Sequence, residues 1–199
     1  MRQDTIVRRA AALIVTAALA NFGGTAQAQE APAVSTAAPD FASSGATRYG
    51  ALDAPVRLSD FHGKTVVLAF FPKARTKGCT VQMQSYRDQY ESLFNGGKDV
   101  VVMGISADPD SALVNWAQEE DFPMLFVSDV GGKVGSLYGA YDAKGKYDKR
   151  ALFIVAPDGR ITYTVPSFNV LSTDAYAELA SEVEKARATK AAAGTHSGH

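Results

Sequence analysis

Cys79 is the one cysteine in the 199-residue chain, and its neighbours make it a candidate reactive thiol. Three cations, Lys73, Arg75 and Lys77, lie within the six residues before it. The thiolate is the nucleophilic form of cysteine, and both nearby positive charge and a helix N-terminus favour it over the thiol. A lone cysteine without such neighbours is more often an inert buried side chain, so this setting predicts a reactive, nucleophilic thiol.

The elements on either side of Cys79 should hold it at a junction between a strand and a helix. The apolar run from Thr65 to Phe71 is typical of a buried strand. After Cys79 the apolar residues step by four, three, four and three, which predicts one face of an amphipathic helix. These residues are Met83, Tyr86, Tyr90 and Leu93.

The rest of the pattern alternates strands and helices. Further strands are expected at Val100 to Ser106, Met124 to Val127, Ala151 to Ala156 and Ile161 to Val165, the last two joined by a turn at Pro157-Asp158-Gly159-Arg160. Further helices are expected at Ser111 to Glu120, Val134 to Tyr138 and Thr173 to Ala188, the last capped by Ser172 or Thr173. The order predicts an α/β fold with a central mixed sheet flanked by helices on both faces. A thioredoxin-like sheet fits this order, as do other three-layer α/β folds.

The N-terminus is typical of a cleavable export signal. Arg2, Arg8 and Arg9 precede an apolar stretch from Ala10 to Ala20, which is shorter than the ~20 residues that span a bilayer. The small residues around Ala28 fit a cleavage site, so we expect a signal peptide over 1–28 and a periplasmic or secreted protein without stable membrane association. A flexible linker is expected over 29–37, one domain over 38–186 and a disordered tail over 187–199.

Composition narrows the classes of partner. Removing Asp4 and the three arginines of the signal takes the formal net charge from −1 to −3. No basic stripe interleaved with aromatic residues is present, so nucleic acid is not an expected partner. An exported protein usually pairs its cysteines, whereas one cysteine cannot close an internal disulfide. The thiol is therefore expected to be buried, joined to another molecule, or retained for its reactivity.

The segment Pro72-x-x-x-Thr76-x-x-Cys79 resembles the active-site motif of the peroxiredoxins. Gly78-Cys79-Thr80 with Gln82 is similar to the bacterioferritin-comigratory, or type Q, branch. The likeness runs from about Ala38 to Leu179. It includes Ala38-Pro39-Asp40-Phe41, Leu58-Ser59-Asp60-Phe61-His62-Gly63-Lys64, Gly104-Ile105-Ser106 with Asp108, Phe122-Pro123 with Ser128-Asp129, and Arg150 to Val155 with Asp158-Gly159. The resemblance implies a thioredoxin-like fold and thiol-dependent reduction of hydrogen peroxide and organic hydroperoxides, without a cofactor or metal.

The resemblance also assigns roles to individual residues. It makes Cys79 the peroxidatic nucleophile, with the Thr76 hydroxyl on the thiolate and the bound peroxide. Pro72 would shield the pocket from water, and Arg150 would favour the thiolate and orient the peroxide. Free cysteine titrates at ~8.5, so only a small fraction is thiolate at neutral pH. Hydrogen-bond donors at the sulfur would favour the thiolate and stabilise charge on the leaving oxygen, whatever the family. Taken alone, Thr76 is equally typical of a helix cap, and Arg150 is more typical of a solvated charge at a strand end.

One departure from the branch decides the expected mechanism. Many type-Q members carry a resolving cysteine five residues after the first, where this chain has Gln84. The sequence therefore predicts a one-cysteine enzyme, whose sulfenic acid is reduced by an external thiol or a thioredoxin-like protein. A monomer or weak homodimer is expected.

Three alternative functions can be compared with the sequence. A disulfide reductase on the same fold needs Cys-x-x-Cys, and a copper chaperone needs a second cysteine where Met83 stands. His62, His196 and His199 do not cluster with Cys79 in sequence. A non-catalytic thiol sensor or redox-dependent binding module, which forms mixed disulfides with a partner, remains open because the resolving cysteine is missing.

Overall fold

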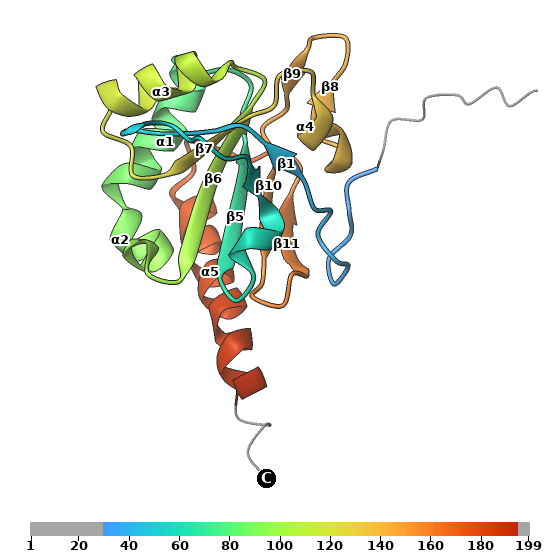
Figure 1. Ribbon diagram of the computed structural model, residues 1–199. Helices are drawn as coiled ribbons and strands as arrows, with labels where there is room; N and C mark the ends of the chain where they lie inside the picture. Colours follow the sequence, from blue (N-terminus) through green and yellow to red (C-terminus); the bar gives the residue numbers. More distant parts are fainter. Residues whose placement is uncertain (1–29, 195–199) are drawn as a thin grey trace, which may run out of the picture.

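A seven-stranded mixed sheet forms the centre of the computed structural model, which describes residues 30–194, with side chains through residue 189 (Figure 1). Its spatial order is β11 (Ile161–Val165), β10 (Leu152–Val155), β5 (Thr65–Phe70), β6 (Val100–Ser106), β7 (Leu125–Ser128), β2 (Gly45–Thr47) and β3 (Gly50–Ala51). The pairs β5–β6 and β6–β7 are parallel, and the remaining neighbours are antiparallel.

Strand β5 lies at the centre of the core because both of its faces are covered. All six of its residues are buried, and successive side chains point to opposite faces. Val67 and Ala69 belong to one apolar cluster, together with Phe71 just beyond the strand. Leu68 and Phe70 belong to the other cluster. The sequence shows this double burial as an uninterrupted apolar run.

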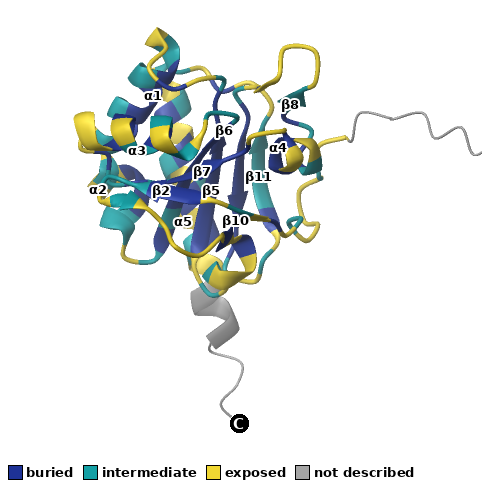
Figure 2. Cartoon of the chain, turned by 45° about the horizontal axis from the view of Figure 1, so that its top comes forward, coloured by how far each residue is buried: buried dark blue, intermediate teal, exposed yellow. Residues whose placement is uncertain are grey.

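Four helices contribute to the first cluster and one to the second. The four are α1 (Lys77–Asp88), α2 (Tyr90–Phe94), α3 (Asp110–Glu119) and α5 (Thr173–Gly194). The second cluster is covered by α4 (Lys133–Leu137), the 3-10 turn Leu58–Phe61 and the paired short strands β1 (Ala42–Ser43) and β4 (Val56–Arg57). Figure 2 shows buried strands between helices whose outer sides are exposed.

Aromatic packing fixes α3 against the sheet. Trp116 is buried, and its ring lies 5.7 Å from that of Phe71, 5.0 Å from that of Phe122 and 5.8 Å from that of Phe126, measured between centroids. Burying each such side chain contributes about 1.5–3 kcal/mol. This cluster joins the end of β5, which leads to Cys79, to the helix behind it.

The expected order of strands and helices is confirmed, with three differences. The single helix expected after Cys79 is interrupted at Gln89, whose φ of −111° and ψ of 22° are not helical. The break turns α2 so that Phe94 meets the buried ring of Tyr86 at 5.2 Å between centroids. The four short strands before β5, of two or three residues each, were not predicted, nor was the hairpin of β8 (Tyr141–Asp142) and β9 (Tyr147–Asp148).

The third difference concerns the C-terminal helix. It begins at Thr173 as expected, with the Ser172 hydroxyl accepting the Ala175 N–H at 3.3 Å, but it continues to Gly194 and not to Ala188. Arg187, which we expected at the start of the tail, binds the carboxylate of Asp99 at 3.0 Å and thereby ties the helix to the loop before β6. Residues 195–199 lie outside the described part.

The segment expected to be a flexible linker is partly ordered. Ser35 N–H donates to the carbonyl of Ile161 at 2.7 Å, and Ala37 forms an isolated antiparallel bridge with Arg160. These bonds use the free edge of β11, which the sequence did not reveal because the lead-in has no strand pattern. The expected signal peptide lies outside the described residues. Within 30–194, no helix is long and apolar enough to cross a bilayer.

Candidate active site

Cys79 is the third residue of α1 and is fully buried. Strand β5 ends at Phe70, a six-residue loop follows, and the helix begins at Lys77 with Thr76 as its N-cap. The first backbone N–H groups of a helix have no acceptor within it, so they carry partial positive charge. The expected placement of the cysteine at a helix start is thus confirmed, and it brings the thiol to the positive end of α1.

Arg150 provides the direct polar contact with the sulfur. Its Nη2 donates to Cys79 Sγ at 3.3 Å across 71 positions of sequence. The register of the sheet explains the encounter, because β10 pairs antiparallel with β5 and sets Leu152 opposite Ala69. The carbonyl of Arg150 accepts the Phe168 N–H at 3.0 Å, which holds its backbone.

Gly78 allows the guanidinium to approach the helix. A Cβ at this position would lie 3.1 Å from Arg150 Nη2, closer than an ordinary van der Waals contact. A larger residue would therefore require the guanidinium to shift by a few tenths of an ångström. The glycine next to the cysteine has a steric role at the site that the motif alone did not explain.

A buried chain of hydrogen bonds continues behind the arginine. Arg150 Nη1 donates to Gln82 Oε1 at 2.5 Å, and Gln82 Nε2 donates to the hydroxyl of Tyr86 at 3.0 Å. Gln82 and Tyr86 are both fully buried. Burial also raises the pKa of Tyr86, so its hydroxyl is neutral. Sequence reasoning used Gln82 only as a family marker and Tyr86 only as a core position.

Thr76 occupies a different place from the one that the resemblance implies. Its side chain is exposed, and its hydroxyl donates to the carbonyl of Lys73 at 2.9 Å and not to Cys79. The tight turn before it has a positive φ of 62° at Arg75, which brings the Lys73 carbonyl within reach. Thr76 thus closes the loop and begins the helix in this conformation.

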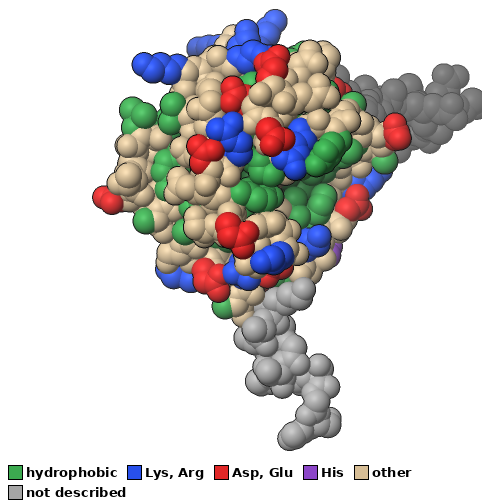
Figure 3. All heavy atoms as spheres, turned by 90° about the vertical axis from the view of Figure 1, so that its left-hand side faces the viewer, with side chains coloured by type: hydrophobic (Ala, Val, Ile, Leu, Met, Phe, Trp, Pro, Cys, Tyr) green, Lys and Arg blue, Asp and Glu red, His purple; other side chains and the backbone are tan. Residues whose placement is uncertain are grey.

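The side chains of the three cations before Cys79 are exposed. Arg75 forms an exposed ion pair with Glu119 at 2.8 Å, and Lys73 and Lys77 are exposed. Exposed charges are strongly screened, so they contribute little at a buried sulfur. Figure 3 shows basic and acidic side chains intermingled on this side of the molecule, around a group of hydrophobic ones. The positive environment that the sequence assigned to these residues comes from Arg150 and the helix start.

Pro72 is half-buried and lines a hollow beside the Cys79 loop. Lys73 and Pro109 line the same hollow, which the tip of the β8–β9 hairpin closes on the other side. The loop itself is fixed by Asp108, whose carboxylate accepts the Ala74 N–H at 2.7 Å and the Ser106 hydroxyl at 2.9 Å.

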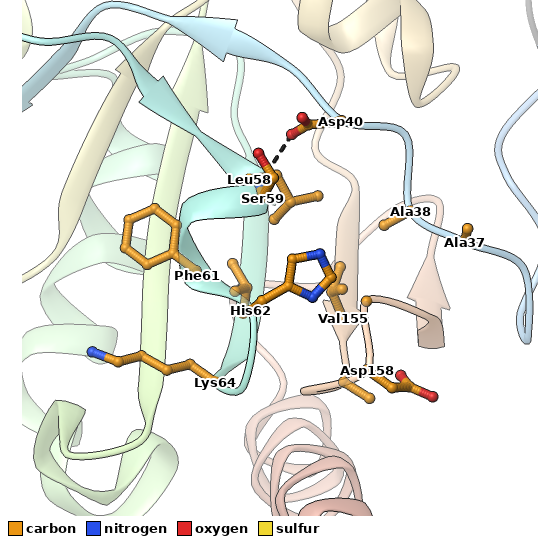
Figure 4. Close-up of a pocket in the computed structure, with 13 residues that line it drawn as sticks. Ala37, Ala38, Asp40, Leu58, Ser59, Phe61, His62, Lys64, Val155 and Asp158 are labelled. Carbon is orange, nitrogen blue, oxygen red and sulfur yellow. Dashed lines mark hydrogen bonds between the residues drawn. The ribbon is translucent and has the colours of Figure 1, made fainter.

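A second hollow contains His62 but none of the residues around the thiol (Figure 4). Figure 4 shows the His62 ring between Phe61 and the turn that carries Asp158. Asp40 at its rim accepts the Ser59 N–H at 3.0 Å. In the part of the chain that the structure describes, no group of three or more histidine, cysteine or acidic residues could hold a metal ion.

Comparison with known proteins identifies the family. The AhpC/TSA family model matches residues 34–164, which is more than half of the chain. The chain belongs to the AhpC/TSA family of peroxiredoxins. Peroxiredoxin Bcp of Escherichia coli K12 is 37% identical over 119 residues, covering 57% of this chain and 75% of the relative. A putative peroxiredoxin of Mycobacterium tuberculosis is 37% identical over 132 residues, covering 62% and 80%.

Solved structures agree with this assignment. Peroxidoxin BcpB of Mycobacterium tuberculosis matches with a TM-score of 0.64 at 27% identity, covering 77% of this chain and 97% of that one. The AhpC protein of Enterococcus faecalis matches with a TM-score of 0.68 at 20% identity, covering 83% and 96%, which supports the fold alone. This peroxiredoxin is of the Bcp, or Q, branch, with a thioredoxin-like fold, and is a thiol-dependent peroxidase.

Gln84 of this peroxiredoxin stands where many members of the branch carry the resolving cysteine. Its Nε2 donates to Glu120 at the end of α3 at 2.9 Å. Arg87, one turn further along, donates to the carbonyl of the same Glu120 at 2.7 Å. The position thus links α1 to α3 and has no part in sulfur chemistry.

Proposed function

We propose that this peroxiredoxin is exported and reduces hydrogen peroxide and organic hydroperoxides through Cys79 alone. The observation that carries the proposal is the contact of Arg150 with the single thiol of the chain. The thiolate attacks one peroxide oxygen, an S–O bond forms and the O–O bond breaks. Sulfur is oxidised to sulfenic acid, and the leaving hydroxide or alkoxide takes up a proton to become water or an alcohol.

An external thiol completes the cycle. It attacks the sulfenic acid of Cys79, releases water and forms a mixed disulfide, which a second thiol then cleaves to regenerate the enzyme. Cys79 is buried, so the reductant reaches the sulfur only when the first turn of α1 opens or when the thiol is small. A thioredoxin-like protein and a small thiol are the two classes of reductant.

The other residues have roles that follow from their places. Arg150 favours the thiolate and donates to the peroxide oxygen that becomes negatively charged. Thr76 reaches the sulfur by rotating its hydroxyl away from Lys73 when peroxide enters. Pro72 excludes water from the Cys79 loop on the side that faces the hollow.

Steady-state peroxide consumption with each class of reductant tests the proposal. The mature protein is assayed with thioredoxin and its reductase, or with glutathione, against the Cys79→Ser variant. Turnover that disappears in the variant supports a one-cysteine enzyme. A stable mixed disulfide without turnover contradicts the proposal and supports a thiol sensor or redox-dependent binding module.

Export is supported by the N-terminal pattern of charged, apolar and small residues. Fractionation of cells that express the full chain, followed by N-terminal mass analysis, tests it. Protein outside the cytoplasm that begins near Gln29 supports export, whereas intact protein in the cytoplasm contradicts it. Sedimentation of the mature protein tests the proposed monomer or weak homodimer.

A further inference from the structure

The Gln82 amide lies between two buried partners, which hold its two ends. The Arg150 guanidinium has only donors and requires the carbonyl oxygen, Oε1, which lies 2.5 Å from Nη1. The Tyr86 hydroxyl accepts from the amide nitrogen, Nε2, at 3.0 Å. If the amide turned over, an N–H donor would face the guanidinium donors. The orientation of Gln82 therefore decides whether Arg150 has an acceptor.

The Tyr86 ring is held firmly enough to anchor the amide in its place. It is fully buried and packs against Phe94 of α2, Tyr176 of α5 and Phe168, at centroid distances of 5.2, 6.1 and 6.4 Å. Phe168 is the same residue whose N–H binds the carbonyl of Arg150. One aromatic cluster thus holds both the tyrosine and the backbone of the arginine.

We propose that Tyr86 is a positioning residue for thiol oxidation, acting through Gln82 on Arg150. Its hydroxyl keeps Oε1 of Gln82 directed at Nη1, which leaves Nη2 of the guanidinium directed at Cys79. Without the hydroxyl, Nε2 is a buried donor with no partner, a costly state that the amide escapes by swinging away. Arg150 then loses its acceptor and no longer stays beside the sulfur. The inference rests on the proposed peroxidase function.

The test is the rate at which one equivalent of hydrogen peroxide oxidises Cys79 in the Tyr86→Phe variant. We expect a fall of about tenfold, the size of effect that follows from one lost buried hydrogen bond. The matched control is Tyr138→Phe. Tyr138 is also fully buried, and its hydroxyl donates to the carbonyl of Pro39 at 2.7 Å, in the cluster on the other face of the sheet. The control is expected to react at the parent rate, and an equal fall in both variants overturns the proposal.

A double-mutant cycle separates positioning from general loosening of the core. Once Gln82→Leu has removed the amide, Tyr86→Phe should cost no further rate, because the hydroxyl has nothing left to orient. An undiminished tenfold loss in that background overturns the proposal. If Tyr86→Phe does not fold alone, combination with Gln82→Glu decides, since a carboxylate presents an acceptor at either end. Parent-like oxidation by Tyr86→Phe/Gln82→Glu supports the proposal, and a tenfold loss relative to Gln82→Glu contradicts it.

The rate of Cys79 alkylation tests the positioning role of Tyr86 independently of the proposed peroxidase function. The rate of Cys79 alkylation by iodoacetamide between pH 5 and 9 reports the fraction of thiolate, whatever the reaction with peroxide. A pH profile displaced upward in Tyr86→Phe but not in Tyr138→Phe supports positioning even if the parent reacts slowly with peroxide. An unchanged profile in Tyr86→Phe contradicts it.

Discussion

At the scale of residues, the sulfur of Cys79 contacts one half-buried cation, whereas three cations near it in sequence are exposed. Arg150 reaches the sulfur from a distant part of the chain, whereas Lys73, Arg75 and Lys77 lie near it only in sequence. Charges interact most strongly where water is excluded. A cation that contacts the buried sulfur therefore affects it more than cations that are near it only in sequence. The sequence drew attention to three cations that the structure places away from the sulfur, and Arg150 is the cation in contact with it.

Replacing Arg150 tests this account. Arg150→Lys keeps the charge, but one ammonium cannot replace a planar fork that binds both Gln82 and Cys79. We expect stopped-flow oxidation of the thiol to slow about tenfold in Arg150→Lys and about a hundredfold in Arg150→Ala. Arg48→Lys, at an exposed arginine paired with Asp121, is the control and should react at the parent rate. Parent-like rates in both Arg150 variants would refute the role.

Thr76 gives a second residue-scale prediction. If its hydroxyl turns from the Lys73 carbonyl to the sulfur during the reaction, Thr76→Val should slow oxidation of Cys79 by roughly tenfold or more, because a donor to the reacting oxygen is lost. Thr76→Ser keeps the hydroxyl and should remain within about twofold of the parent. Equal rates for the two variants would show that Thr76 serves only to close the loop.

Some residues of the site can be recognised from the sequence, and others cannot. Cys79 and Arg150 could be paired through the family motif, but not from their spacing of 71 residues. Tyr86 sits at helical spacing with Met83, a pattern typical of core packing, and nothing in the sequence marks its hydroxyl as part of the site. Gly78 next to Cys79 is visible, but the reason for it is the approach of Arg150.

At the scale of elements, the long core strands were predictable and the short connections were not. The apolar runs of β5 and β6 are buried on both faces, so hydrophobicity alone marks them. The break between α1 and α2 at Gln89 is hidden because apolar residues keep helical spacing across it. The β8–β9 hairpin has two-residue strands and buries a carboxyl, which no apolar pattern indicates.

That buried carboxyl belongs to Asp148, which is fully buried beside Asp129. Desolvation and then the charge of Asp129 raise the pKa of Asp148 to about 8. Asp129 accepts the N–H groups of Val134 and Gly135 at 2.8 and 2.7 Å, so it is the better site for the negative charge. The Asp148 oxygens have no donor near them, which fits a protonated carboxyl that donates to Asp129.

This pair predicts how stability depends on pH. Unfolded Asp148 titrates near 3.8, so between that pH and about 8 the folded state holds a proton that the unfolded state has lost. The buried Asp148 carboxyl therefore lowers the free energy of unfolding more and more as pH rises through this window. Asp148→Asn mimics the protonated form and should remove the dependence, a gain on the order of 1–3 kcal/mol at pH 8. Thermal unfolding from pH 5 to 9, with the exposed Asp53→Asn as control, measures it. Parallel curves for the parent and both variants would contradict the pairing.

At the scale of the whole molecule, the fold is closed at one edge by its own N-terminal lead-in. Ser35 and Ala38 donate to the carbonyls of Ile161 and Gly159 at 2.7 and 2.9 Å, and Ile161 donates to Thr36 at 2.9 Å. A backbone hydrogen bond contributes a net ~0.5–1.5 kcal/mol, partly offset by the entropy of ordering the segment. The compact unit therefore begins before residue 38.

Truncation tests where the unit begins. A chain that starts at Gln29 should unfold at higher denaturant concentration than one that starts at Pro39, by about 1–2 kcal/mol in free energy. Chemical denaturation of the two chains measures the difference. Indistinguishable midpoints would show that the lead-in contributes nothing and that the sequence-based boundary at residue 38 was sufficient.

Single-turnover oxidation shows whether Cys79 is a peroxidatic thiol. Reduced protein that begins at Gln29 is mixed with one equivalent of hydrogen peroxide in a stopped-flow instrument, and sulfenic acid at Cys79 is trapped and identified by mass. We expect second-order oxidation of this one thiol at a rate orders of magnitude above that of free cysteine. A rate equal to that of free cysteine would rule out a peroxidatic role.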